Sequence, residues 1–225
     1  MRHLFGTFIC ILLISFPAAA QSPGGAETQA LSAMENYHQG RELEYQNRMN
    51  EANIHYNEAV RQCLEEISAN AATRTTYTVL TWTLQRQKRY PEVISWGERG
   101  LRSFPDEYRI VEIMGEAFFY LDDYARSLAY MQRYTNALPN GDRVSVAYFF
   151  SGEIYRLTQK YHHADIAYTT ALRLEPNLAL WWYRLGSVRE EIGDKNHAIE
   201  AYQQVLRINP NHSEARNRLA ILQDN

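Results

Sequence analysis

The stretch YHHADIAYTTALRLEPN, Tyr161 to Asn177, is followed 34 residues later by KNHAIEAYQQVLRINPN, Lys195 to Asn211. Both lines keep Ala, Tyr, Leu and Pro at the same places and differ at most of the others. Similarity that returns at a fixed spacing of this size indicates tandem structural units that pack on one another. The chain therefore contains at least two copies of one unit.

The same register extends toward the N-terminus and gives four consecutive blocks, 74–107, 108–144, 145–178 and 179–212. The second block is three residues longer than the others. Large apolar residues dominate the fourth, seventh and eleventh positions, and the eighth and twentieth positions are mostly small. Position 32 is a proline in every block: Pro105, Pro139, Pro176 and Pro210.

This spacing predicts a helical hairpin in each block. Apolar residues at the fourth, seventh and eleventh positions share one face of an α-helix. A second apolar stripe follows and ends before the proline, which cannot continue a helix. Small residues, Gly152 with Ala164 and Gly186 with Ala198, would let the two helices approach closely. One hairpin buries only part of its apolar surface, so each copy supplies the surface on which the next one packs.

The pattern resembles the tetratricopeptide repeat family, first in WWYRLGSVREEIGDKNHAIEAYQQVLRINP, Trp181 to Pro210, and next in Tyr148 to Pro176. The resemblance covers residues 74–212. It implies an all-α fold, a right-handed α-solenoid of tandem helix-turn-helix repeats, whose activity is binding rather than catalysis.

Some residues depart from the family pattern. Gly97 and Gly100 weaken the second helix of the first block, Tyr134 stands where the family usually has alanine, and Arg189 replaces an aromatic residue. The longer connection through Asn140-Gly141-Asp142 is typical of a turn. It predicts irregular stacking between the second and third blocks.

The flanking segments extend the array. Residues 213–225 are predicted to form a C-terminal capping helix. Residues 27–73 are predicted to hold N-terminal helices with a degenerate repeat that starts near Ala33 and places Gly40 eighth and Leu43 eleventh.

Residues 1–20 have the pattern of a secretory signal peptide. Arg2 and His3 precede an apolar run, Leu4 to Phe16, that small residues close. This run is too short to span a bilayer, and no later segment is apolar for long enough, so we expect no membrane span. Residues 21–26 are expected to be a flexible leader. Export to the periplasm of a bacterial envelope is the expected localisation, with secretion as the alternative.

Neither catalysis nor metal binding is predicted. The chain lacks a nucleophile elbow, a phosphate loop and a paired-histidine zinc motif, so it is not expected to be an enzyme or to need a cofactor. His162 and His163 are adjacent on an expected exposed face, which does not make a metal site. A net charge of −3 argues against nucleic acid as a partner. Cys63 lies among apolar helical neighbours and is expected to be a buried small hydrophobe.

In the family that this chain resembles, the second, fifth, ninth, twelfth and thirteenth positions of each first helix line a concave groove. Aromatic side chains at these positions are expected to be exposed, with charges around them that orient a partner. The predicted partner-binding groove comprises Trp82, Arg109, Glu112, Glu116, Phe119, Tyr120, Phe149, Glu153, Arg156 and Tyr183.

Two functions remain open at this point. The first is an exported scaffold or adaptor that binds a protein or peptide segment in the groove, in envelope assembly or secretion. The alternative is a periplasmic protein that binds a small molecule or cell-wall fragment in a closed pocket lined by the same residues. For either function, N-terminal or capping helices could instead cover the groove.

Overall fold

The computed structural model describes residues 31–224, and this range contains eleven helices and no strand. The predicted all-α architecture of tandem helical repeats is therefore confirmed. The expected signal peptide (1–20) and leader (21–26), together with residues 27–30 and Asn225, lie outside the described residues.

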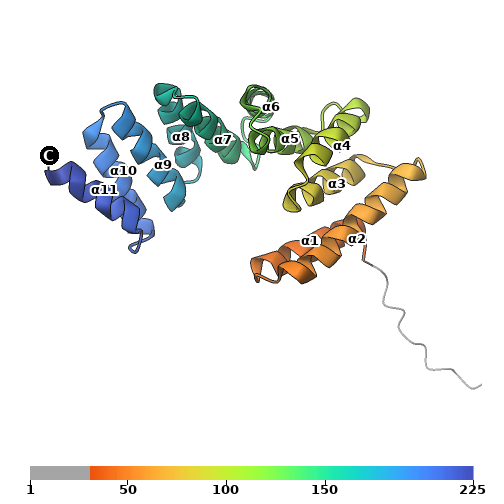
Figure 1. Cartoon of the computed structure of the whole chain (residues 1–225). Coiled ribbons are helices and arrows are strands. Elements are labelled where there is room, and N and C mark those ends of the chain that lie inside the picture. Colours follow the sequence, from red (N-terminus) through yellow and green to blue (C-terminus); the bar gives the residue numbers. More distant parts are fainter. Residues whose placement is uncertain (1–30, 225) are drawn as a thin grey trace, which may run out of the picture. The chain divides into compact units, whose positions relative to one another are not determined.

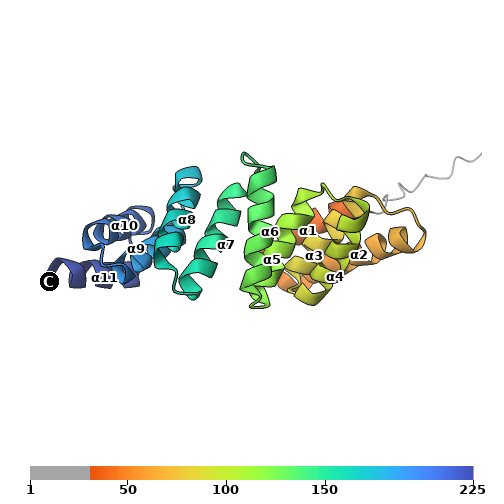
Figure 2. The same cartoon turned by 90° about the horizontal axis from the view of Figure 1, so that it is seen from above.

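Ten of the helices form five successive hairpins (Figures 1 and 2). The two helices of each hairpin pack together, and each second helix contacts the next hairpin. The first helices also touch one another from α1 to α7, so we call the odd-numbered helices α1 to α9 the inner helices. The elements are α1 (Ala33–Tyr45), α2 (Met49–Ser68), α3 (Arg74–Arg86), α4 (Tyr90–Ser103), α5 (Tyr108–Tyr120), α6 (Tyr124–Ala137), α7 (Val144–Leu157), α8 (Tyr161–Leu174), α9 (Ala179–Glu191), α10 (Lys195–Ile208) and α11 (Ser213–Asp224).

The N-terminal hairpin follows the same plan. Helix α1 begins at Ala33 after a capping box, in which Ser32 and Glu35 satisfy each other's backbone N–H groups. Gly40 and Leu43 are buried, as the repeat register requires. Its partner α2 is 20 residues long, which accounts for the extra residues before Arg74.

The turn inside each hairpin contains one residue with a left-handed backbone. This conformation crowds the Cβ of every residue except glycine. All five residues occupy the fifteenth position of their repeat: Asn47 (φ 60°), Lys88 (58°), Asp122 (58°), Gln159 (57°) and Gly193 (76°). Four of the five are not glycine. The hairpin geometry therefore imposes this conformation whatever the side chain.

Glycine at this position should stabilise the hairpin. We expect Gln159→Gly to raise the free energy of unfolding by about 0.5–1 kcal/mol, because a left-handed residue other than glycine is strained by about 1–2 kcal/mol and the entropy of the unfolded chain offsets part of the gain. Gly193→Ala should lower it by a similar amount, since no atom lies within 4 Å of the added Cβ and only the backbone strain changes. Urea denaturation of both variants measures the two effects, and equal signs would contradict the account.

Close approach of the two helices depends on a glycine beneath a large side chain. A Cβ on Gly152 would lie 2.7 Å from the ring of Tyr168, too close for van der Waals contact. Both alanines of the expected small-residue pairs, Ala164 and Ala198, are fully buried, but the atoms nearest to a Cβ on Gly152 and Gly186 belong to Tyr168 and Tyr202. The contact pairs sixteen residues apart are Gly40 with Tyr56, Gly115 with Met131, Gly152 with Tyr168, and Gly186 with Tyr202.

A methyl group at such a glycine should destabilise the protein. We expect Gly152→Ala to lower the free energy of unfolding by about 1–3 kcal/mol, the usual cost of overpacking, because the fully buried Tyr168 ring cannot move aside freely. Gln132→Ala, on the exposed surface of α6, is the control and should stay within about 0.5 kcal/mol of the parent. Chemical denaturation provides the measurement, and a stabilised Gly152→Ala would refute the close contact.

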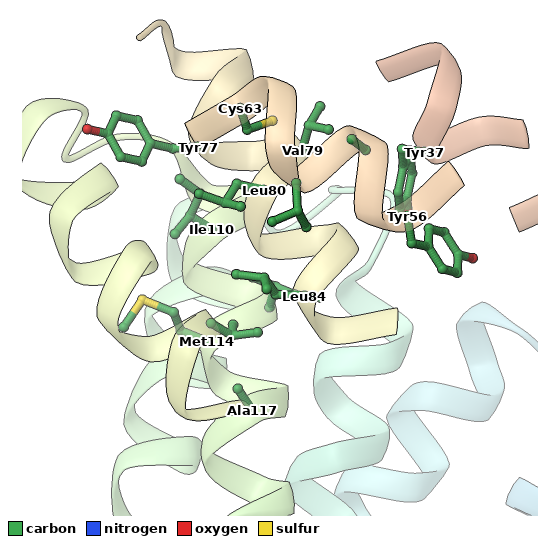
Figure 3. Packing of buried hydrophobic residues seen from close by; sticks show 14 of the residues in the cluster. Tyr37, Tyr56, Cys63, Tyr77, Val79, Leu80, Leu84, Ile110, Met114 and Ala117 are labelled. Carbon is green, nitrogen blue, oxygen red and sulfur yellow. The ribbon is translucent and has the colours of Figure 1, made fainter. Parts of the chain in front are cut away.

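The first large core lies between α2, α3 and α5 (Figure 3). Leu80, Leu84, Ile110 and Met114 are completely buried in this cluster, and Ile110 and Met114 lie beside Gly97 of α4. Cys63 packs into the same cluster, and burial raises the pKa of its thiol to about 12. This confirms its role as a small hydrophobic side chain. No helix of residues 31–224 is long and apolar enough to cross a membrane.

Candidate functional site

A cavity of about 290 Å³ lies on the inner helices α1, α3 and α5. Aromatic and charged side chains from these helices form most of its wall, and two residues of the following elements complete it. The lining residues are Tyr37, His38, Arg41, Trp82, Gln85, Arg86, Arg109, Glu112, Ile113, Glu116, Tyr134 and Arg143.

A stack of three side chains from three successive inner helices forms one wall. The Tyr37 ring lies on the Trp82 ring, with 5.5 Å between centroids and an interplanar angle of 30°. The guanidinium of Arg109 lies 5.7 Å from the Trp82 ring centroid, within the range of a cation–π contact. Glu107 holds Arg109 in place, since its buried carboxylate accepts bonds from Arg109 Nε at 2.6 Å and Nη2 at 2.8 Å.

Two buried glutamates of α5 share one arginine in the cavity lining. Glu112 and Glu116 stand one helical turn apart and are 2% and 7% exposed. Arg143 donates to Glu112 from Nε at 3.1 Å and Nη2 at 3.0 Å, and also donates to Glu116. Gln85 donates to Glu116 at 2.8 Å. Burial and the neighbouring Glu116 raise the pKa of Glu112 well above its usual value, despite the opposing effect of Arg143.

Arg143 comes from the connection between α6 and α7, which contains the three extra residues of the second block. Its backbone N–H donates to the Tyr134 hydroxyl at 3.3 Å, which fixes the end of the connection over α6. Burial alone would lower the pKa of Arg143, but Glu112 and Glu116 outweigh it and raise the pKa. The irregular segment expected from sequence therefore delivers a permanent cation to the cavity.

Two further arginines approach from the other side. Arg86 of α3 forms a two-bond pair with Glu44 of α1, with distances of 2.9 Å from Nε and 2.5 Å from Nη2. Tyr56 donates its hydroxyl to the same carboxylate at 2.7 Å. Arg41 has no carboxylate partner among residues 31–224, and its guanidinium lies 5.9 Å from the Tyr37 ring centroid.

The cavity brings together four of the predicted groove residues, Trp82, Arg109, Glu112 and Glu116. Sequence reasoning missed Tyr37, Arg41, Arg86 and Arg143, which line the same space. The first three occupy groove positions of their own repeats, so applying the register to α1 and to the end of α3 would have found them. Arg143 lies in a connection, which the register does not cover.

The groove glutamates that were expected to orient a partner are engaged within the protein. Glu112, Glu116 and Glu153 are all buried and bound to neighbouring side chains. Glu153 accepts one hydrogen bond from the Tyr168 hydroxyl and another from Arg156 Nη2 at 2.9 Å. Arg184 Nε lies 3.1 Å from the same carboxylate and forms an ion pair with it. Arg156 is therefore engaged as well, and this pair belongs to the packing between α7, α8 and α9.

The predicted aromatic residues are mostly packed rather than free. Phe149 stacks on Trp181 with centroids 4.8 Å apart, and Phe119 meets Phe150 edge to face at 5.0 Å. Tyr183 lies on the imidazole of His212 at 5.0 Å. These three are half-buried, so the predicted exposure of the ring faces is wrong for them. Tyr120 is 49% exposed although one of its faces stacks on Tyr90.

Metal coordination has no candidate in residues 31–224, where no three His, Cys, Asp or Glu side chains are grouped suitably. His162 and His163 are exposed at the start of α8. The cavity therefore offers hydrogen bonds, charge and aromatic faces rather than a set of metal ligands.

Models of the tetratricopeptide repeat match residues 145–178 and 179–212, the α7–α8 and α9–α10 hairpins. These two hairpins are tetratricopeptide repeats, so the chain contains repeats of this family. No curated protein matches the sequence. The matched repeats lie outside the charged cavity, which is built by the earlier and more divergent repeats.

Solved structures share the fold. The APC/C hetero-tetramer Cut9-Hcn1 superposes with a TM-score of 0.68 at 16% identity over 84% of this chain and 36% of that one. MamA from Desulfovibrio magneticus RS-1 gives 0.63 at 15% identity, over 80% and 97%. YrrB gives 0.56 at 18% identity, over 83% and 91%. These identities are low, so the likeness establishes the arrangement of helices alone.

The raised pKa of Glu112 makes the free energy of unfolding depend on pH. The raised pKa of Glu112 means that the folded protein binds this proton more tightly than the unfolded chain. Its stabilising contribution is complete below the ordinary glutamate pKa and is lost as pH rises through the folded-state pKa. Glu112→Gln should therefore match the parent near pH 4 and be more stable near pH 8, by on the order of 1 kcal/mol.

Urea titrations at several pH values measure this difference. Glu98→Gln, an exposed carboxyl on α4, is the matched control and should follow the parent at every pH. A parent that gains stability relative to Glu112→Gln as pH rises would contradict the argument.

Proposed function

We propose that this protein is a binding scaffold that holds a protein or peptide segment along its inner helices. The observation that carries the proposal is a row of exposed large side chains at one repeat position. Tyr45, Tyr120 and Leu157 are each the last residue of an inner helix and are 87%, 49% and 43% exposed. Exposed apolar groups that recur at one repeat position supply the contact area that a bound segment needs.

The comparisons support binding as the activity. YrrB is described as a TPR protein with an unusual peptide-binding site, and Cut9 was solved as an assembly with Hcn1. Tetratricopeptide repeat proteins are in general scaffolds without catalytic activity. A protein or peptide partner is therefore the class that this fold favours, and catalysis is not part of the proposal.

The proposal places the scaffold in the bacterial envelope, in assembly or secretion. The support is the signal-peptide pattern of residues 1–20, which lies outside the described part of the structure. Mass determination of the mature protein from the periplasmic fraction of the source cells tests this point, and a mature chain that begins at Gln21 is expected. A protein found with Met1 in the cytoplasm would overturn the localisation and leave the binding proposal standing.

One observation favours the second function, binding of a small molecule. The cavity volume of about 290 Å³ is near the lower limit for small-ligand pockets. Native mass spectrometry of protein purified from source cells separates the two functions. A stoichiometric small ligand would favour the second, whereas a ligand-free chain that retains a partner protein favours the scaffold.

Tyr45 and Leu157 can be tested against two exposed apolar residues on the second helices of the hairpins. Tyr45→Ser combined with Leu157→Ser should remove capture of the natural partner, because both side chains lie on inner helices and bind the segment. Ile54→Ser combined with Ile166→Ser is the matched control, since these residues of α2 and α8 are 68% and 67% exposed on the other helices. Affinity capture from the native envelope, quantified by mass spectrometry, gives the comparison.

Both double variants should unfold within about 0.5 kcal/mol of the parent per substitution, as surface changes usually do. Equal capture by the two variants would contradict binding along the inner helices. Phe149 and Tyr183 are not suitable sites for this test, because their rings pack on Trp181 and His212 and their removal would disturb the fold.

A further inference from the structure

Four arginines reach the inner cavity from four separate places in the chain. Arg41 comes from α1, Arg86 from α3, Arg109 from α5 and Arg143 from the connection before α7. They stand against two carboxylates in the lining, those of Glu112 and Glu116. Glu44 and Glu107, which are outside the lining, pair with Arg86 and Arg109, so the four arginines meet four carboxylates. Arg41 is the one of the four without a carboxylate partner within residues 31–224.

The carboxylates hold three of these arginines by one edge of the guanidinium. Glu44, Glu107 and Glu112 each accept from Nε and Nη2 of their own arginine. The Nη1 atoms of Arg109 and Arg143 have no hydrogen-bond partner within residues 31–224, and each carries two N–H donors, whereas Arg86 also interacts with Tyr56. The three arginines are thus oriented by the protein, and Arg109 and Arg143 keep donors available for a ligand.

Arg41 is the fourth donor and is held differently. It has no carboxylate partner in the described range and lies beside Tyr37 at the entrance of the cavity. Arg109 is fixed against Trp82 from the other side. A planar guanidinium recognises carboxylate or phosphate oxygens through two parallel bonds, so several guanidinium groups around one cavity favour a ligand with several anionic oxygens.

We propose that the inner cavity is an anion-binding site in which Arg41, Arg86, Arg109 and Arg143 take a group that carries two or more carboxylate or phosphate oxygens. The proposal uses the inner-helix face of the proposed function but does not depend on the partner being a protein. The anionic group is either an acidic part of a bound segment or a free small anion. Glu112 and Glu116 position Arg143 for this role and oppose an anion by their own charge.

Isothermal titration calorimetry with two probes tests the proposal. One probe is citrate, and the other is a capped peptide of three consecutive glutamates, with the matching glutamine peptide as its blank. The parent should bind at least one of the two anions, and rising salt should weaken binding. Binding of the peptide alone assigns the site to a partner segment, whereas binding of citrate alone assigns it to a free ligand.

Single substitutions identify the site. Arg41→Gln and Arg109→Gln should each weaken binding at least about tenfold, in line with the loss of one charge-assisted bond. Arg41 is exposed and has no carboxylate partner among the described residues. Arg41→Gln should therefore leave the melting temperature unchanged, even if Arg109→Gln lowers it. Arg102→Gln, an exposed arginine of α4 outside the cavity, is the control and should bind like the parent.

Glu112→Gln gives an opposite and independent result. Removal of a negative charge from the wall should tighten anion binding, whereas a cavity that takes a cation would lose affinity. Absence of binding by both probes, or unchanged affinity in Arg41→Gln and Arg109→Gln, would overturn the anion site. Neither outcome bears on capture of a partner by Tyr45 and Leu157, so the two proposals fail separately.

Discussion

The close contact of a glycine with a large side chain in the same hairpin is the constraint on which the rest of the structure depends. In three hairpins the large side chain is a buried tyrosine, Tyr56, Tyr168 or Tyr202, whose ring lies on Gly40, Gly152 or Gly186. A buried hydroxyl needs a partner. Each of these tyrosines donates to a glutamate of its own inner helix: Glu44, Glu153 and Glu190 respectively.

The same contact arranges the charges of the inner helices. A carboxylate held by a tyrosine is fixed in place, and each of the three binds an arginine: Arg86, Arg156 and Arg218. The order glycine, tyrosine, glutamate and arginine therefore connects backbone packing to surface charge. Arg156 belongs to the same repeat as its glutamate, whereas Arg86 and Arg218 come from the following helices α3 and α11. In the α5–α6 hairpin Met131 replaces the tyrosine and has no hydroxyl. There Glu112 and Glu116 receive no tyrosine bond, and Arg143 from the longer connection takes that place.

Periodicity was sufficient to predict the hairpins, because positions four, seven and eleven must share a helix face wherever the pattern occurs. It could not identify the residue that meets each glycine, since positions twenty and twenty-four of the repeat lie on the same face of the second helix. Alanine at position twenty is buried, as Ala164 shows, but Tyr168 at position twenty-four makes the close contact. The left-handed residues at position fifteen could not be predicted either, because only one of the five, Gly193, is a glycine.

The candidate site was less accessible to sequence reasoning for a different reason. Groove positions were assigned by register, which fixes the face of a helix but not the burial of its side chains. Phe149 is at a groove position, yet Trp181 of the next repeat covers its ring. Glu112 is at the equivalent position one repeat earlier and is also buried, because Arg143 arrives from outside the register. What covers a groove residue therefore depends on the neighbouring repeat and on connections.

These differences divide the inner helices into two parts of unlike chemistry. Helices α1, α3 and α5 surround the arginine-lined cavity. Helices α7 and α9 have no such cavity in the described structure. There Phe149 stacks on Trp181, and the large exposed apolar side chains are Leu157 and Leu180, which are 43% and 51% exposed. A segment bound along all of these helices would meet charge first and apolar contact second. If a segment binds as proposed, such a face would discriminate between its two directions, because an acidic end placed against α9 would lose the arginines and gain only apolar neighbours.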